Sequence, residues 1–126
     1  MTKDPLQVLN QIAQILYDKK GFNILALDVR AVSTLTDFFI IVEGNVDKHV
    51  IALAKAVMKS MKDIGGLPSH VEGLDTGDWV VIDYVEIVIH FFMPGMREKY
   101  CLEELWREGE VVDLDIAVEN VQSRVS

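Results

Sequence analysis

One run of five consecutive apolar residues, Phe38-Phe39-Ile40-Ile41-Val42, limits the folds open to this chain more than any other feature. Side chains alternate between the two faces of a strand, so this run places apolar groups on both faces. Such strands occur inside sheets whose two faces are both covered. A second short run, Ile24-Leu25-Ala26-Leu27, precedes it across a polar connection. We therefore expect two neighbouring strands within a layered α/β fold.

Two segments have the apolar spacing of amphipathic helices. The first is predicted over residues 5–20, with Asp4 as N-cap, Pro5 in the first turn and Lys19-Lys20-Gly21 at the end. The second is predicted over residues 46–64, before Gly65-Gly66. The apolar stripes consist of Leu6, Leu9, Ile12, Ala13 and Leu16 in the first helix, and Val50, Leu53, Val57, Met61 and Ile64 in the second.

The second half of the chain is rich in strand formers. A short strand is expected within residues 69–72, and a hairpin over residues 79–84 and 86–92. Pro94 then opens a third predicted helix that ends at Gly109. The order of elements predicts a single α/β sandwich domain, residues 1–109, with a mixed five-stranded sheet. Residues 110–126 have no clean period and are expected to form an acidic, partly disordered tail.

Composition narrows the class of protein. The chain has 126 residues, a formal charge of -8 and a single cysteine, Cys101. It is therefore long enough for one domain with its own core, and it contains no internal disulfide or cysteine-rich zinc site. No apolar stretch approaches the ~18 residues of a membrane span, and the start lacks an export signal, so we expect a cytoplasmic protein. The acidic balance disfavours nonspecific attraction to phosphates and favours a basic partner.

The predicted hairpin holds the candidate binding residues. Strand alternation puts Trp79, Val81 and Asp83 on one face and Val80, Ile82 and Tyr84 on the other. A tryptophan, an acid and a neighbouring tyrosine suit an interface with a basic protein, because aromatic residues anchor protein contacts and an acid pairs with basic groups. The alternative is that Trp79 belongs to the core or to a contact between two copies of the chain.

The remaining hairpin candidates each have two interpretations. Asp83, Tyr84 and Glu86 surround the turn, where they either join an interface or belong to a solvated loop. His90 follows an apolar run and is either a hydrogen-bonded core histidine or a contact residue.

The third predicted helix contributes Arg97 and Tyr100, about one helical turn apart. They either support the same binding face or tie this helix to the sheet. Cys101 has apolar neighbours and no evident activating base, so it is expected to be a small buried residue.

The pieces of sequence that carry a family resemblance are spread over residues 6–106. They are Asp28-Val29, Thr36-Asp37-Phe38-Phe39-Ile40-Ile41, Gly44 with His49-Val50, Glu72-Gly73, Gly77-Asp78-Trp79-Val80-Val81-Ile82-Asp83-Tyr84, Ile87-Val88-Ile89-His90-Phe91-Phe92 and Arg97-Glu98-Lys99-Tyr100-Cys101-Leu102-Glu103-Glu104-Leu105-Trp106. In this order and spacing the chain resembles the ribosomal silencing factor, or iojap-like, family. It departs from the family pattern at Val46-Asp47, where small hydroxyl residues are common, and at Val85-Glu86, where a Gly-Asp turn is common. The hairpin must therefore turn without the glycine that usually supplies a positive φ.

The resemblance implies a fold akin to nucleotidyltransferases without their catalytic residues. It also implies docking onto the large ribosomal subunit through ribosomal protein fourteen (uL-fourteen), which takes part in a bridge to the small subunit. A factor bound there would block subunit joining by occupancy and so repress translation. Neither a membrane nor a specific nucleic-acid sequence is expected as a partner.

The alternatives to this function are a nucleotidyltransferase-like enzyme and a homodimeric structural module. A nucleotidyltransferase needs magnesium-binding carboxylates soon after a Gly-Ser turn, yet Gly44 precedes Asn45, and Asp113-Leu114-Asp115 lies far along the chain. No histidine pair has the i, i+4 spacing of a metal site. We therefore expect no enzyme, cofactor or metal. A homodimeric structural module would instead bury the Trp79 face against a second copy of the chain.

Overall fold

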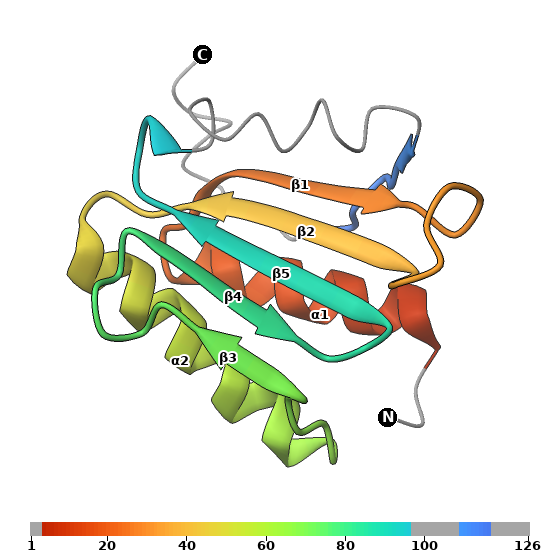
Figure 1. Ribbon diagram of the computed structural model, residues 1–126, viewed down its shortest axis with the longest axis horizontal. Helices are drawn as coiled ribbons and strands as arrows, with labels where there is room; N and C mark the ends of the chain where they lie inside the picture. The colour runs from red at the N-terminus through yellow and green to blue at the C-terminus, as the bar shows by residue number, and fades with distance from the viewer. Residues whose placement is uncertain (1–3, 97–108, 117–126) are drawn as a thin grey trace.

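The computed structural model describes residues 4–96 and 109–116 and shows a six-stranded mixed sheet with two helices on one face (Figure 1). In chain order the elements are α1 (Pro5–Asp18), β1 (Phe22–Asp28), β2 (Phe38–Glu43), α2 (Asp47–Asp63), β3 (His70–Glu72), β4 (Trp79–Asp83), β5 (Ile87–Phe92) and β6 (Glu110–Val111). The order across the sheet is β3-β4-β5-β2-β1-β6; β2 and β5 are parallel, and the other neighbours are antiparallel. The α/β sandwich is confirmed, with one strand more than predicted.

β2 lies inside the sheet, as its composition requires. All six of its residues are buried, and its neighbour is β1, as predicted; the two strands pair antiparallel. Phe38, Ile40 and Val42 belong to the core cluster beneath the helices, whereas Phe39 and Ile41 belong to a second cluster on the opposite face. Each large apolar side chain buried in this way contributes roughly 1.5–3 kcal/mol. Both faces of the sheet are therefore covered around β2.

The ends of α1 show how the chain enters and leaves this layer. The Asp4 carboxylate caps the helix by accepting a hydrogen bond from the Leu6 N–H (3.4 Å). At the other end the left-handed residue is Lys20 (φ 71°), and the Gly21 N–H donates to the Leu16 carbonyl (2.7 Å). The helix thus ends at Asp18, two residues earlier than predicted, in a Schellman motif whose left-handed position is a lysine.

Gly21 is required for a different reason. A Cβ at this position would lie 2.9 Å from both the Leu16 carbonyl oxygen and Val42 Cγ2. The glycine therefore permits close packing of the helix end against β2 rather than supplying a positive φ.

α2 runs almost as predicted and ends in the same motif with glycine in the left-handed position. Gly65 has φ 84°, and the Gly66 N–H donates to the Met61 carbonyl (2.8 Å). Near its start, His49 Nδ1 accepts from the Asn45 N–H (2.9 Å), and Nε2 lies 2.8 Å from the Lys19 carbonyl oxygen. The histidine therefore fastens the beginning of α2 to the end of α1.

The segment after residue 109 is ordered where the tail was expected to begin. β6 pairs with β1 through Leu27↔Val111 and Asp28↔Glu110, and the Asp115 N–H donates to Asn10 Oδ1 (2.8 Å). Two paired residues are too short to leave a periodic pattern, so the sequence did not predict this strand. Of the third predicted helix, Pro94 and Gly95 form a turn, and residues 97–108 lie outside the described ranges. No helix within those ranges is long and apolar enough to cross a bilayer.

Candidate functional site

The second face of the sheet, opposite α1 and α2, carries the side chains that strand alternation predicted there. Trp79, Val81 and Asp83 are partly buried on this face, whereas Val80 and Ile82 are fully buried beneath the helices. A separate apolar cluster covers the middle of the second face: Leu27, Val29, Phe39, Ile41 and Phe92, with Leu25, Trp79, Val88 and Met96 packed against it. Trp79 therefore lies where this cluster meets the polar edge formed by β3 and β4.

Trp79 is held in one orientation by its neighbours on β5. Its ring stacks on Phe92 with centroids 5.3 Å apart and an interplanar angle of 28°. Its indole N–H donates a hydrogen bond to His90 Nδ1 (3.1 Å). Because both the flat surface and the polar group of the indole are engaged, the side chain is positioned before any partner arrives.

His90 is a buried histidine with a hydrogen-bond partner, which is the first of its two sequence-based interpretations. Only 8% of its surface is exposed, and its ring meets Phe39 edge to face at 4.9 Å. Burial lowers the pKa of His90 from 6.5 to about 4, so the ring is neutral at physiological pH. A neutral ring that accepts at Nδ1 carries its proton on Nε2. His90, on the neighbouring strand β5, thus holds the Trp79 ring in position through this hydrogen bond.

Tyr84 does not share the surface of Trp79. It is 5% exposed and belongs to the core cluster beneath the helices. Its hydroxyl has no hydrogen-bond partner among the described residues, and burial raises the pKa of Tyr84 to about 12. Tyr84 therefore does not share a patch with Trp79: it follows the end of β4, and its side chain lies on the helix side of the sheet, whereas that of Trp79 lies on the other side.

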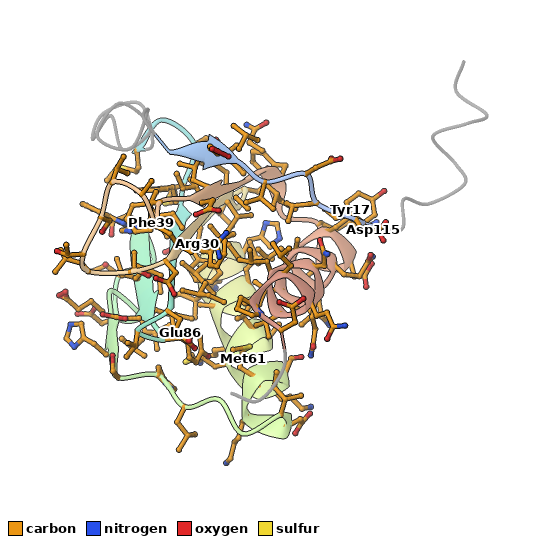
Figure 2. All side chains as sticks on the ribbon, turned by 90° about the vertical axis from the view of Figure 1, so that its right-hand side faces the viewer. Tyr17, Arg30, Phe39, Met61, Glu86 and Asp115 are labelled. Carbon is orange, nitrogen blue, oxygen red and sulfur yellow. The ribbon has the colours of Figure 1, made fainter. Side chains whose placement is uncertain are left out.

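Asp83 and Glu86 lie at the tip of the hairpin. The Asp83 carboxylate accepts from the Val85 N–H (2.7 Å), and the Glu86 N–H donates to the Tyr84 carbonyl (2.9 Å). This i to i+2 bond closes a tight turn around Val85, whose positive φ of 74° is uncommon for residues other than glycine. The chain thus forms the hairpin without glycine and leaves the Glu86 side chain exposed at its end (Figure 2).

Strand register adds residues that sequence reasoning did not select. β3 and β4 pair through His70↔Asp83 and Glu72↔Val81, so the Glu72 carboxylate lies beside the tryptophan edge. Glu72, Gly73, Trp79 and Val81 line a shallow pocket of about 310 Å³, called the Trp79 pocket below. A Cβ at Gly73 (φ 88°) would lie 2.0 Å from the Trp79 carbonyl oxygen, so only glycine allows this approach.

The arrangement suits recognition better than catalysis. An aromatic floor is fixed by stacking and a hydrogen bond, and Glu72 lines the pocket beside it. Asp83 and Glu86 add two carboxylates at the other end of β4, at the hairpin tip. Across the described ranges, no group of three or more histidine, cysteine or acidic residues could hold a metal ion. Two further candidates, Arg97 and Tyr100, lie outside the described residues.

Comparisons with known proteins agree on one family. The family model described as ribosomal silencing factor during starvation matches residues 2–126, which extends the resemblance past Trp106 and through the tail. The ribosomal silencing factor RsfS of Bacillus subtilis is 35% identical over 111 residues, covering 88% of this chain and 94% of its own. A mouse protein named mitochondrial assembly of ribosomal large subunit protein 1 is 29% identical, over 78% of this chain and 44% of its own.

A solved structure supports the same relationship. The crystal structure of a protein from Chromobacterium violaceum has a TM-score of 0.81 to this chain at 28% identity. The similarity covers 93% of this chain and 95% of that protein. The likeness in sequence and the likeness in fold therefore extend over nearly the same length.

Proposed function

Because this chain belongs to the ribosomal silencing factor family, we propose that it binds the large ribosomal subunit and blocks its association with the small subunit, so repressing translation. The mouse relative is named for assembly of the ribosomal large subunit, which supports the large subunit as the partner. The family resemblance favours ribosomal protein fourteen as the docking point. The action is obstruction by occupancy, with no bond made or broken, and takes place in the cytoplasm.

The observation that carries this proposal is the preorganised Trp79 pocket, with Glu72 in its lining and the acids Asp83 and Glu86 at the hairpin tip. An aromatic side chain fixed in advance loses little conformational entropy on binding, and such anchors dominate interface energies. These acids steer a basic protein surface into register and disfavour acidic partners. We assign direct contacts to Trp79, Asp83, Glu86 and Glu72, and a positioning role to His90.

A subunit-joining assay tests the function and the face together. Small and large subunits are mixed at a magnesium concentration that favours association, with and without the protein, and separated on a sucrose gradient. The test variant is Asp83→Asn combined with Glu86→Lys, because asparagine keeps an acceptor for the Val85 N–H while removing the charge. The control is Asp18→Asn combined with Asp113→Lys, which changes the charge by the same amount away from the hairpin.

Wild type and control should both lower the yield of joined ribosomes and sediment with the large subunit. The test variant should bind roughly 10-fold more weakly, because one acid of the hairpin tip loses its charge and the other becomes a lysine that repels the basic partner. If wild type leaves joining unaffected and stays at the top of the gradient, the silencing function is wrong for this chain. If test and control variants act alike, the function stands but the assigned face is wrong.

A further inference from the structure

The lysines of the described part of the chain gather on the two helices, where they outnumber the aspartates Asp18, Asp47 and Asp63. Six exposed lysines lie at the end of α1 or along α2: Lys19, Lys20, Lys48, Lys55, Lys59 and Lys62. The remaining described cation, Arg30, is already paired with Asp28 (Nη2 to Oδ2, 2.7 Å). In a chain of formal charge -8, the lysine side chains of the described residues therefore gather on the helical side of the molecule.

The lysines of α2 form a single stripe. Lys48, Lys55, Lys59 and Lys62 are spaced by seven, four and three residues, which returns to the same helical face each time. From Lys48 to Lys62 the stripe spans about 21 Å at the helical rise of about 1.5 Å per residue. Together with Lys19 these four residues are called the lysine ridge. Its residues belong to α2 and the end of α1, and the two helices lie on one face of the sheet (Figure 1), whereas Trp79 packs against the apolar cluster of the other face.

A groove between the two helices widens the ridge. It has a volume of about 410 Å³ and is lined by Ile15, Lys19, Lys55, Ala56, Lys59, Ser60 and Asp63. Gln11 Nε2 donates to Ser60 Oγ (3.1 Å) and so joins α1 to α2 beside it. Over residues 4–96 and 109–116, none of the five ridge lysines forms an ion pair with a carboxylate, not even with Asp63 inside the groove.

Helix stability does not account for this arrangement. Lys55 and Lys59 are four residues apart and Lys59 and Lys62 three apart, and like charges at these spacings cost a few tenths of a kcal/mol each. The helix dipole favours Lys62 in the last turn but disfavours Lys48 in the first. Solubility is already served by the net negative charge. The ridge is therefore kept against local repulsion.

We propose that the lysine ridge binds the phosphate backbone of large-subunit RNA, so that the protein holds its partner with two opposite faces. The inference rests on the proposed function for the identity of the RNA. Lysines bind phosphates as point charges, and a ridge of lysines alone has neither the forked guanidinium nor the aromatic ring that reads bases. The contact is therefore independent of sequence, and it releases counterions from the RNA.

Salt dependence of binding tests the proposal. Binding of the full chain to isolated large subunits is measured between roughly 50 and 300 mM monovalent salt at constant magnesium, and the logarithm of affinity is plotted against that of salt. The ridge variant is Lys55→Gln/Lys59→Gln/Lys62→Gln, since glutamine keeps helix propensity. The control is Gln7→Glu/Thr34→Glu/Leu35→Glu, which changes net charge by the same three units at exposed positions elsewhere.

Losing three phosphate contacts should lower the magnitude of the slope by about 2–3 and weaken binding on the order of 10- to 100-fold near physiological salt. The control should keep the wild-type slope. A second arm uses an RNA duplex of roughly 20 base pairs at low salt, which wild type and control should bind and the ridge variant should not.

Equal slopes for wild type and ridge variant would overturn the proposal while leaving the blocked joining intact. A ridge variant that loses subunit affinity but binds the duplex normally would also overturn it, because the ridge would then contact an acidic protein. Should wild type fail to bind subunits, the silencing function falls and the duplex arm alone decides. Duplex binding lost only in the ridge variant then supports the ridge, and binding that is absent or equal in all three proteins refutes it.

Discussion

Val85 provides a measurable strain at the tip of the interface hairpin. It has φ 74°, although β-branched residues avoid the left-handed region, and 60% of its surface is exposed. Holding an ordinary L-residue there costs about 1–2 kcal/mol. Asparagine tolerates this region better than other non-glycine residues, so Val85→Asn should relieve much of the strain. The lost packing is small, about 0.5 kcal/mol, because most of the side chain already meets solvent.

The expected net effect of Val85→Asn is a rise of roughly 0.5–1 kcal/mol in the free energy of unfolding. Val85→Gly should be close to neutral, because the greater freedom of glycine in the unfolded chain offsets about 0.5–1 kcal/mol of the relief. The control is Val32→Asn, a loop valine of similar exposure (44%) outside the positive-φ positions. It should lose roughly 0.5–1 kcal/mol, since it gains nothing in return.

Equilibrium unfolding in urea measures all three variants. With a slope of roughly 1–3 kcal/mol per molar urea, the two asparagine variants should differ in midpoint by several tenths of a molar or more, with unchanged slopes. Both tip carboxylates remain, so binding to the large subunit should stay at the wild-type level. If Val85→Asn destabilises the protein as much as Val32→Asn does, the turn stores no strain and the reasoning fails.

Two further predictions concern the buried side chains of His90 and Tyr84. The lowered pKa of His90, about 4 against 6.5, contributes stability that is present above pH 6.5 and lost as the pH falls towards 4; the loss should approach 2–3 kcal/mol. Stability curves at pH 7 and pH 5 should therefore differ more in wild type than in His90→Phe, and equal differences would contradict the burial argument. Tyr84→Phe removes a buried hydroxyl without a described partner, so stability should be unchanged or slightly higher, and subunit binding unchanged. A binding loss in that variant, at normal stability, would return Tyr84 to the interface.

The spacing of apolar residues along the chain was enough to predict the main helices and strands. The apolar run of β2, the stripes of α1 and α2 and the β4–β5 hairpin are visible in sequence because spacing alone determines which face is buried. β6 was not predicted, since two residues paired to a distant strand leave no period. The left-handed conformation of Lys20 was not predicted either, because the neighbouring Gly21 is the stronger local signal for the end of a helix. In the structure, close packing and not backbone conformation requires glycine at position 21.

The candidate site was predictable only in part. Trp79, Asp83 and Glu86 were found because strand alternation and turn position are local properties. Glu72 and Gly73 join them through the β3–β4 register, which a single sequence does not specify. Tyr84 was included because of its proximity in sequence, although alternation had already placed it on the other face.

The charge of the whole chain was a poor guide to its surfaces. The formal net charge of -8 disfavours attraction of the chain as a whole to phosphate, but it does not describe the charge of each face. The lysine ridge appears only when the helical phase of α2 is combined with its position beside the end of α1.

The parallel pair at the centre of the sheet has a consequence for the way the chain assembles. β1 and β2 are joined by a short connection, and so are β3, β4 and β5, so each group can pair early through contacts close in sequence. Phe38 of β2 instead pairs with Ile87 of β5, and the chain between these two residues contains the whole of α2. Closing that long loop costs more entropy than forming a hairpin. We therefore expect the pairing of β2 with β5 to form late in folding. The Trp79 pocket lies entirely within the group of β3, β4 and β5, so the residues that line it can come together before β2 and β5 pair.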